Sequence, residues 1–249
     1  MAGKSRSSAW RLCSWLLITV IAVVAVGQPQ AAPKHEASVR PGVNERYKNG
    51  TEPVEVWVDR FERKSREIYS RRDKIVSALR LKKGERVADI GAGTGFFSMM
   101  FAKAVGPKGK VFAVDINPKF IQLIKGRAAK ANIDNIETVL CKDDSAELPD
   151  ASVDVVFICD TYHHFEYPRS TLASIRRALR PGGRMVVIDF YHIKGKSSDW
   201  TMRHVRAGRE TFKAEIVAAG FEWVDDGPDA GFLKQNYLMR FRKPRGTSR

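Results

Sequence analysis

Cysteine is scarce in this sequence, with three among 249 residues. Cys13 lies in an apolar stretch near the N-terminus, whereas Cys141 and Cys159 lie in apolar runs typical of strands. No two of these cysteines have the spacing of a metal knuckle or of a redox dithiol, which excludes a disulfide framework. We expect Cys141 and Cys159 to be small core residues.

Acidic residues are also scarce relative to basic ones. The chain has 28 Asp and Glu against 43 Lys and Arg, and its formal net charge is +15. This excess predicts either an anionic partner, such as phosphate, lipid headgroups or nucleic acid, or a basic surface that only keeps the protein soluble. Charge alone does not choose between these interpretations.

Long apolar runs are missing except for the stretch from Leu12 to Val26, which basic residues precede and small residues follow. As a helix this run would span about 22 Å, which is short of the roughly 30 Å of a bilayer core. Residues 1–27 are therefore expected to be a cleavable secretory signal or, alternatively, a membrane anchor. The expected location is exported or membrane-anchored. The positive charges on the two sides of the run are nearly balanced, so the side of the membrane stays open.

Two further segments precede the main domain. Residues 28–53 are polar and rich in proline and glycine, which predicts a flexible linker. Residues 54–83 carry an apolar stripe at helical spacing, which predicts one or two helices packed on the main domain rather than a ligand cage. The stripe consists of Trp57, Phe61, Ile68, Ile75 and Leu79.

Strand-like and helix-like segments alternate over residues 84–243, before a basic tail at 244–249. The predicted strands are Arg86–Ile90, Lys110–Asp115, Ile136–Cys141, Val153–Cys159 and Arg184–Phe190, followed by a final pair at Phe221–Asp225 and Tyr237–Arg242. The predicted helices are Gly95–Val105, one that begins after Asn117, one from Pro168 to Pro181, and Arg209–Ala219. Continuous apolar strands alternating with helices predict an α/β fold with a doubly wound, mostly parallel sheet.

The strongest local motif is the stretch from Val87 to Gly95, VADIGAGTG, in which a strand runs into a glycine turn that opens a helix. Glycines let the backbone approach a ligand closely, and a helix N-terminus offers unpaired N–H groups. Asp115 ends the next strand about twenty residues later, where a carboxylate can accept both hydroxyls of a ribose. In a doubly wound sheet these positions meet at the carboxyl ends of the strands.

The segment from Arg86 to Phe190 resembles the class I S-adenosylmethionine-dependent methyltransferases, in particular the broad group related to the ubiquinone/menaquinone C-methyltransferases. The resemblance rests on Asp89–Gly95, on Asp115, on the segment that begins DSAELP at Asp144, and on LRPGG at 179–183. It implies S-adenosyl-L-methionine as the cofactor. It also implies a Rossmann-like sheet of seven strands whose last strand is antiparallel, preceded by N-terminal helices. In that strand order Cys141 and Cys159 are not on neighbouring strands.

The resemblance also implies which residues hold the cofactor. The leading acid and the glycine turn would surround its methionine part, Asp115 its ribose and Asp144 its adenine, while the segment from Asp160 would face the transferable methyl group. The implied cofactor residues are Asp89, Gly91, Ala92, Gly93, Gly95, Asp115, Ile116, Asp144, Ser145 and Asp160. Structural alternatives stay open: Asp115 as a helix cap, Asp89 as a support of the turn, and Asp144 as part of a surface turn.

Methyl transfer from a sulfonium is an in-line displacement, so a base is needed only when the acceptor must lose a proton. His163 and His164 follow the fourth strand, and His192 follows the fifth. His163 or His164 is the preferred base or substrate contact and His192 a further candidate, with a packing role as the alternative. A metal site formed by Asp160, His163 and His192 is conceivable, but nothing in their spacing demands one, and no metal is expected.

Three other functions compete with this interpretation. A nicotinamide dehydrogenase is disfavoured because Phe96 stands where the dinucleotide fingerprint requires glycine or alanine. A nucleic-acid methyltransferase, acting on RNA for example, fits the charge, but the chain lacks the base-methylating motif after its fourth strand. A non-catalytic S-adenosylmethionine-binding protein is the third alternative. We expect a methyltransferase for a small-molecule or lipid-like acceptor, with an anionic membrane as a further partner of its basic segments; the oligomeric state is not predicted.

Overall fold

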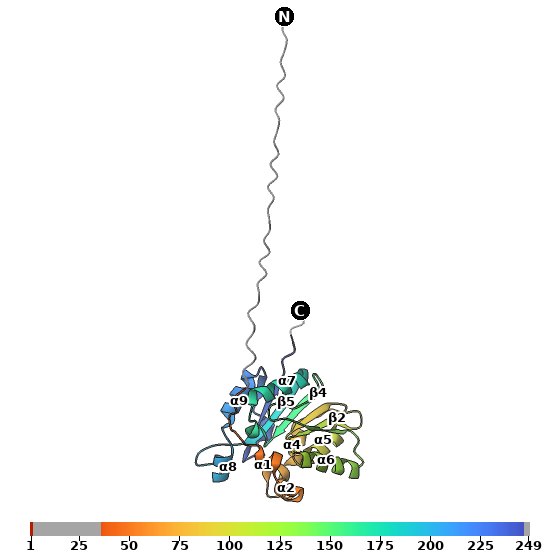
Figure 1. Ribbon diagram of the computed structural model, residues 1–249, viewed down its shortest axis with the longest axis vertical. Coiled ribbons are helices and arrows are strands. Elements are labelled where there is room, and N and C mark those ends of the chain that lie inside the picture. Colours follow the sequence, from red (N-terminus) through yellow and green to blue (C-terminus); the bar gives the residue numbers. More distant parts are fainter. Residues whose placement is uncertain (2–35, 247–249) are drawn as a thin grey trace. The chain divides into compact units, whose positions relative to one another are not determined.

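The computed structural model describes Met1 and residues 36–246 (Figure 1). Clustering of contacts divides the chain into two units, Met1–His35 and Glu36–Arg249, and every helix and strand given below belongs to the second. Apart from Met1, the predicted leader lies outside the described residues, as does the predicted linker up to residue 35. Within the described residues, no helix combines the length and apolar character needed to cross a membrane.

The rest of the predicted linker, residues 36–53, is folded, so that prediction is wrong there. Residues 45–49 form a helix, and Asn44 is buried. The backbone N–H of Val39 donates to the carbonyl of Glu166, and the Glu166 carboxylate accepts from Ser38 Oγ at 2.9 Å and from Gly42 N at 3.3 Å. These long-range hydrogen bonds satisfy polar groups that would otherwise bind water. They hold in place a segment whose composition alone predicts flexibility.

The apolar stripe expected over residues 54–83 folds into more helices than predicted. Instead of one or two there are three short ones, and a bend around residues 62–66 separates the first from the second. The four N-terminal helices are α1 (Glu45–Asn49), α2 (Val54–Phe61), α3 (Glu67–Ser70) and α4 (Arg72–Ala78). Trp57 and Ile75 of the stripe are buried away from the cavity described below, whereas Phe61 and Ile68 line it, so only part of the stripe has the expected packing role.

The core is a seven-stranded sheet in the order β3-β2-β1-β4-β5-β7-β6. Only β7 runs against its neighbours, β5 and β6, while the other described pairs are parallel. The predicted fold class is therefore confirmed. The strands are β1 (Arg86–Ile90), β2 (Lys110–Asp115), β3 (Ile136–Leu140), β4 (Val153–Cys159), β5 (Leu179–Phe190), β6 (Glu222–Asp225) and β7 (Asn236–Arg242).

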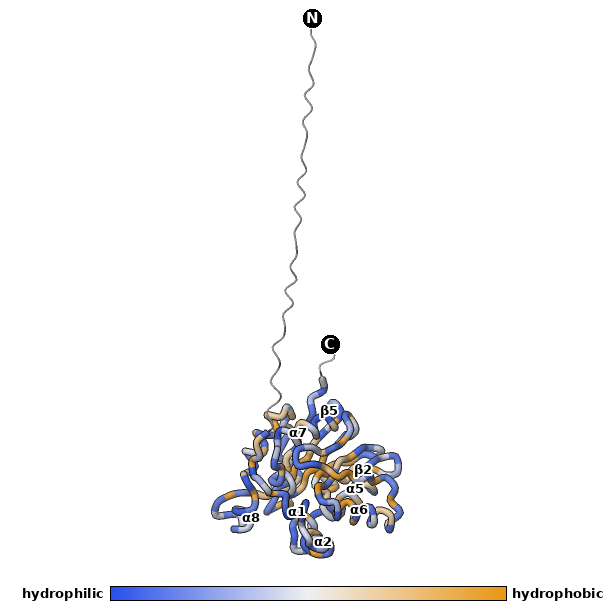
Figure 2. The backbone as a smooth tube through the Cα atoms, viewed as in Figure 1, coloured by the Kyte–Doolittle hydropathy of each residue, from blue (hydrophilic) through white to orange (hydrophobic). Residues whose placement is uncertain are grey.

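Helices cover both faces of the sheet, as an apolar parallel sheet requires. In Figure 1, α7 and α9 lie on one side of the strands and α4, α5 and α6 on the other, in agreement with the two main apolar clusters. Figure 2 shows hydrophobic residues along the central strands and hydrophilic residues in many of the loops. The remaining helices are α5 (Phe96–Val105), α6 (Pro118–Lys130), η1 (Tyr162–His164), α7 (Pro168–Ala178), α8 (Asp199–His204), α9 (Arg209–Ala218) and η2 (Pro228–Ala230).

The strand register brings distant residues together at the carboxyl edge of the sheet. Ile90 pairs with Val114 and with Ile158, so the residues that follow these three positions stand side by side. Cys159 pairs with Ile188, so the next residues along β4 and β5 are neighbours as well. Cys141 and Cys159 follow or end non-adjacent strands and are both free, as expected.

Candidate active site

The glycine turn connects β1 to α5. Gly91, Gly93 and Gly95 have φ angles of 72°, 56° and 78°, a region that favours glycine. A Cβ atom on Gly91 would lie 2.3 Å from Thr161 Cγ2, and one on Gly95 would lie 2.5 Å from Ile124 Cγ1. The first and third glycines therefore let the chain turn and also let the turn pack closely against Thr161 and Ile124.

Asp115 fastens this turn to the end of β2. Its Oδ2 atom accepts a hydrogen bond from Gly93 N at 2.7 Å and its Oδ1 atom accepts one from Asn117 N at 2.8 Å. The side chain of Asn117 accepts from Lys119 N and caps α6, so the capping role belongs to Asn117. Asp115 is 6% exposed, and burial raises its pKa to about 6.

Asp89, the leading acid of the motif, is buried beneath the same turn. It accepts a hydrogen bond from Ser98 Oγ at 2.6 Å, which ties β1 to α5. Burial raises its pKa to about 7, and the charge of Asp115 acts in the same direction. Asp89 therefore supports the turn and also lines the cavity described next.

A cavity of about 950 Å³ opens at this edge of the sheet. Its size is at the upper end of the range of small-molecule sites, and it is lined by Gly91, Ala92, Gly93, Asp115 and Ile116 among the predicted cofactor residues. Thr94 Oγ1, also at the wall, is buried without a hydrogen-bond partner within the described residues. A nucleoside-bearing cofactor fits this wall, because it offers the carboxyl of Asp115, a glycine backbone without side chains and the unsatisfied hydroxyl of Thr94. Gly95 is not among the lining residues and packs against α6 instead.

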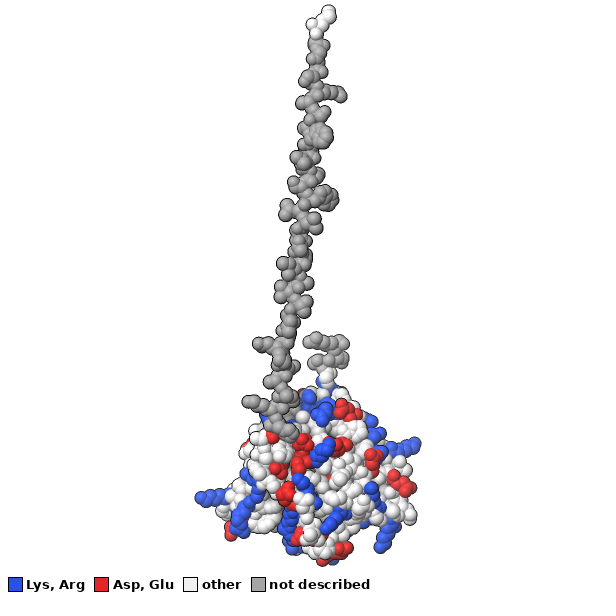
Figure 3. Space-filling model, viewed as in Figure 1, with Lys and Arg blue, Asp and Glu red and all other residues white. Residues whose placement is uncertain are grey.

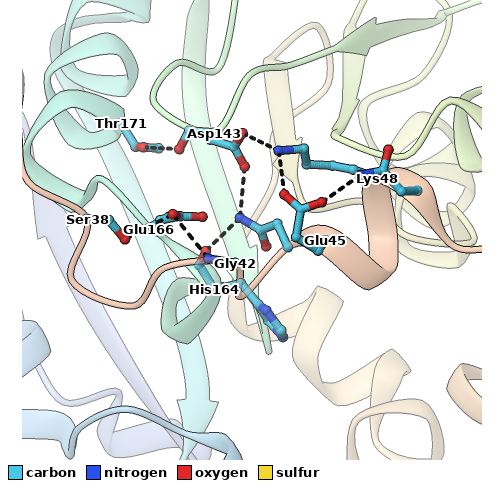
Figure 4. Close-up of polar contacts among 10 residues, drawn as sticks. Ser38, Gly42, Glu45, Lys48, Asp143, His164, Glu166 and Thr171 are labelled. Atoms are coloured by element: carbon cyan, nitrogen blue, oxygen red, sulfur yellow. Dashed lines mark hydrogen bonds and ion pairs between the residues drawn. The ribbon is translucent and has the colours of Figure 1, made fainter.

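The wall beyond β3 differs from the prediction in one residue. Ser145 lines the cavity, and so does Asp143, whereas the predicted Asp144 is not among the lining residues. Asp143 accepts hydrogen bonds from Lys48 Nζ at 2.8 Å and from Asn44 Nδ2 at 3.2 Å (Figure 4). These contacts with the N-terminal segment, which the sequence did not indicate, orient Asp143.

Asp160 lies where β4 ends, with its side chain 5% exposed and a φ of 48°, an uncommon conformation outside glycine. It accepts from Arg66 Nη2 and from Asn236 Nδ2, both at 2.6 Å. Burial raises its pKa, while the charge of Arg66 opposes this shift. Asp160 lines the cavity and also joins the N-terminal helices to β7.

The predicted catalytic histidines are not all brought together. His163 and His164 line the cavity, whereas His192 is not among its lining residues and lies with Nε2 3.3 Å from the carbonyl oxygen of Met202. His163 Nδ1 lies 2.8 Å from Oδ1 of Asp189, which is fully buried at the end of β5. The sequence analysis missed Asp189, although an acid inside an apolar strand is a signal that could have found it.

It also missed the contribution of α8. His204 lines the cavity, and its ring centroid is 5.0 Å from those of both His163 and His164. Trp200 of the same helix stacks on His204 at 4.4 Å. No spacing motif links this loop to the strand ends, so only the three-dimensional structure reveals the contact.

Comparisons with known proteins agree with this geometry. A family model described as a methyltransferase domain matches residues 81–240. The ubiquinone/menaquinone biosynthesis C-methyltransferase UbiE of Burkholderia mallei is 33% identical over 115 residues, which are 46% of this chain and 47% of that protein. The match therefore spans about half the length of this curated relative.

Solved structures share the fold. A SAM dependent methyltransferase from Aquifex aeolicus aligns with a TM-score of 0.66 at 21% identity, covering 78% of this chain and all of the other. The [4+2]-cyclase SpnF aligns with a TM-score of 0.60 at 18% identity, covering 72% of this chain and 82% of the other. At these identities the likeness concerns the fold alone, and the second name shows that the fold is not confined to enzymes named as methyltransferases.

The doubly wound sheet with its antiparallel last strand and the glycine turn are features of the class I S-adenosylmethionine-dependent methyltransferases, whose cofactor is S-adenosyl-L-methionine. Because the methyltransferase domain model covers most of the chain, this chain belongs to that family.

Proposed function

We propose that the protein transfers the methyl group of S-adenosylmethionine to a small or lipid-like acceptor that carries an apolar ring. The observation that supports this most directly is the cavity of about 950 Å³, which is lined by the glycine turn and Asp115 and also by several aromatic side chains. Aromatic and apolar walls with a few polar groups are typical of small-molecule sites. The aromatic residues away from the turn are Tyr47, Phe165, Phe190 and Trp200.

The name of one relative suggests an acceptor class. The 33% identical relative is named for C-methylation in ubiquinone/menaquinone biosynthesis. We extend this acceptor class to the present chain because its cavity offers an apolar wall beside the cofactor residues. A hydroxylated aromatic ring with an apolar tail is the acceptor chemistry that we propose.

The residues contribute mainly by positioning. In the proposed reaction an electron pair of the acceptor forms the new bond to the methyl carbon, while the sulfonium–carbon bond breaks and its electron pair stays on sulfur. The acceptor then loses a proton if it held one at the reacting atom. Asp115 and the glycine turn hold one reactant, and the aromatic walls hold the other and keep water out, so that the in-line geometry is established by binding.

The surface supports a small acceptor over a nucleic acid. On the face seen in Figure 3, lysines and arginines are interspersed with aspartates and glutamates rather than gathered into one basic patch. A nucleic-acid site requires a continuous basic footprint. An RNA acceptor and a non-catalytic binding role remain alternative outcomes of the test below.

The first test is calorimetric titration of the full chain with S-adenosylmethionine and S-adenosylhomocysteine. We expect micromolar binding, weakened at least tenfold, about 1.4 kcal/mol, by Asp115→Ala. The matched control is Asp150→Ala, since Asp150 is exposed and lies outside the cavity. Methyl transfer from labelled cofactor is then assayed on hydroxylated aromatic lipids and on RNA.

Binding that Asp115→Ala leaves unchanged would contradict the assignment of the cofactor wall. Binding without transfer to any acceptor would favour the non-catalytic role, and transfer to RNA alone would replace the proposed acceptor class.

A further inference from the structure

Three histidines from separate parts of the chain meet at the cavity wall. His163 and His164 belong to η1, and His204 ends α8. One ring nitrogen from each lies within 4.8 Å of the other two. The centroids of the first two rings are 4.3 Å apart, and all three rings line the cavity. This is a compact set of nitrogen ligands, which a single ion could bridge.

Two of these histidines carry nitrogens that are buried and unsatisfied. His163 Nε2 and His164 Nδ1 have no hydrogen-bond partner among the residues that the structure describes. A buried polar atom without a partner costs about 1–3 kcal/mol. A cation that takes the lone pairs of two such atoms on adjacent rings would remove this cost.

Asp189 fixes the ring of His163 in the orientation that ligation requires. Its Oδ1 atom lies 2.8 Å from His163 Nδ1, and its Oδ2 atom accepts from His163 N at 3.1 Å. The ring proton is therefore assigned to Nδ1, which leaves the lone pair on Nε2. Metal-binding histidines commonly donate their other ring N–H to a carboxylate in this way.

The surroundings of the other two rings disfavour their charged forms. Burial lowers the pKa of His164 well below its usual value and that of His204 to about 4, and the neighbouring His163 and Arg40 act in the same direction. The buried carboxylate of Asp189 partly balances the charge of a cation there.

We propose that His163, His164 and His204 bind a divalent transition metal of the zinc class, with a coordination position open to the cavity for a hydroxyl oxygen of the acceptor. Three protein nitrogens and one open position are the pattern of catalytic zinc sites. Nitrogens bound tetrahedrally at 2.0–2.1 Å lie about 3.4 Å apart, so side-chain rotations must draw the nitrogens, which lie within 4.8 Å of one another, closer by up to about 1.4 Å.

Such a metal would do two things for the acceptor. It would hold the hydroxyl oxygen in place, and it would lower the pKa of that hydroxyl, so that the proton leaves to solvent without a protein base. This part of the proposal rests on the proposed methyltransferase function. The binding of the metal itself does not depend on that function.

The test uses the full chain without a histidine tag, stripped of metal by a chelator and titrated with Co²⁺ and with Zn²⁺. We expect one equivalent of Co²⁺ to give visible d–d absorption and Zn²⁺ to displace it. His163→Ala and His204→Ala should weaken Zn²⁺ binding at least tenfold, and Asp189→Asn should weaken it by about 10–100-fold. The matched control is His192→Ala, which removes a histidine outside the cluster and should leave Zn²⁺ affinity unchanged.

Two results would overturn the proposal. One is the absence of Co²⁺ absorption and of Zn²⁺ binding in a protein that still binds S-adenosylmethionine; loss of methyl transfer in His163→Ala would then favour a base. The other is an equal loss of affinity in His192→Ala and in His204→Ala, which would place the ion elsewhere. Metal binding without cofactor binding would instead contradict the proposed function and leave the metal site standing.

Discussion

At the scale of single residues, the acids beside the glycine turn are buried and accept few hydrogen bonds. Asp89 is 3% exposed and accepts one side-chain hydrogen bond, from Ser98. Burial raises its pKa from 3.8 to about 7, more than that hydrogen bond can offset, and the charge of Asp115 adds to the rise. The site thus keeps a carboxyl in an environment that disfavours its charge, a feature common where a protein binds ligands.

This burial makes stability depend on pH in a defined direction. An acid whose pKa is higher in the folded state takes up a proton on folding, so its stabilising contribution is full below about pH 4 and is lost as the pH rises to about 7. Asn cannot ionise and can still accept from Ser98. Asp89→Asn should therefore gain stability relative to the wild type across this range, by at most about 1.4 kcal/mol per pH unit.

Urea denaturation of both proteins at a series of pH values measures this difference. Asp150→Asn is the matched control, because it removes an exposed carboxyl. A difference between Asp89→Asn and the wild type that is constant from about pH 4 to about pH 7 would contradict the raised pKa.

The residues that could be predicted from sequence are those whose position follows from a strand end. The glycine turn and Asp115 were found because a parallel sheet brings its carboxyl ends together. Asp143 and His204 were missed because their place at the cavity depends on where α1 and α8 pack. No short sequence motif encodes the packing of such a helix. The roles of the predicted cofactor residues stay predictions, although the cavity gathers most of them.

At the scale of elements, the N-terminal segment helps to hold α7 in place. Glu36, about 130 residues earlier in the chain, accepts hydrogen bonds from Arg169 N at 2.9 Å and from Ser170 N at 2.7 Å. These are free N–H groups of the first turn of α7, where a negative charge also interacts favourably with the helix dipole. Burial opposes the charge of Glu36, but the two backbone donors lower its pKa overall.

Glu36→Ala should therefore lower the free energy of unfolding by about 1 kcal/mol, as the loss of a helix cap does. Hydrogen exchange should also become faster at the N–H groups of Arg169 and Ser170. Glu222→Ala, at an exposed strand position, is the control and should change neither. If both variants unfold at the same urea concentration as the wild type, the contact contributes nothing measurable.

The elements themselves show what composition can and cannot predict. The strands of the core were predicted within a few residues, since apolar runs between turns have few alternatives in an α/β protein. The start of β5 at Leu179, before the predicted Arg184, and the folded segment after Glu36 were missed. Both depend on hydrogen bonds to residues far away in sequence, which local patterns do not contain.

At the scale of the whole molecule, the chain joins a predicted leader to a domain that needs a cofactor. Residues 2–35 lie outside the described residues, so the leader stays a prediction from the basic residues before the apolar run at 12–26. A secretory signal would carry the domain away from the cytosol, where S-adenosylmethionine is made. Location therefore decides whether the proposed reaction has its cofactor, which makes it the first property to measure in cells.

We predict that the mature protein begins near residue 28 and is recovered outside the cytosol. N-terminal sequencing after cell fractionation measures both properties. Leu17→Arg should block export, because an arginine in the middle of an apolar segment costs about 2.5–3.5 kcal/mol on insertion, whereas the control Leu17→Val should not. An intact N-terminus in the membrane fraction would identify an anchor instead. An intact N-terminus in the cytosol would contradict the leader and remove the conflict with the supply of cofactor.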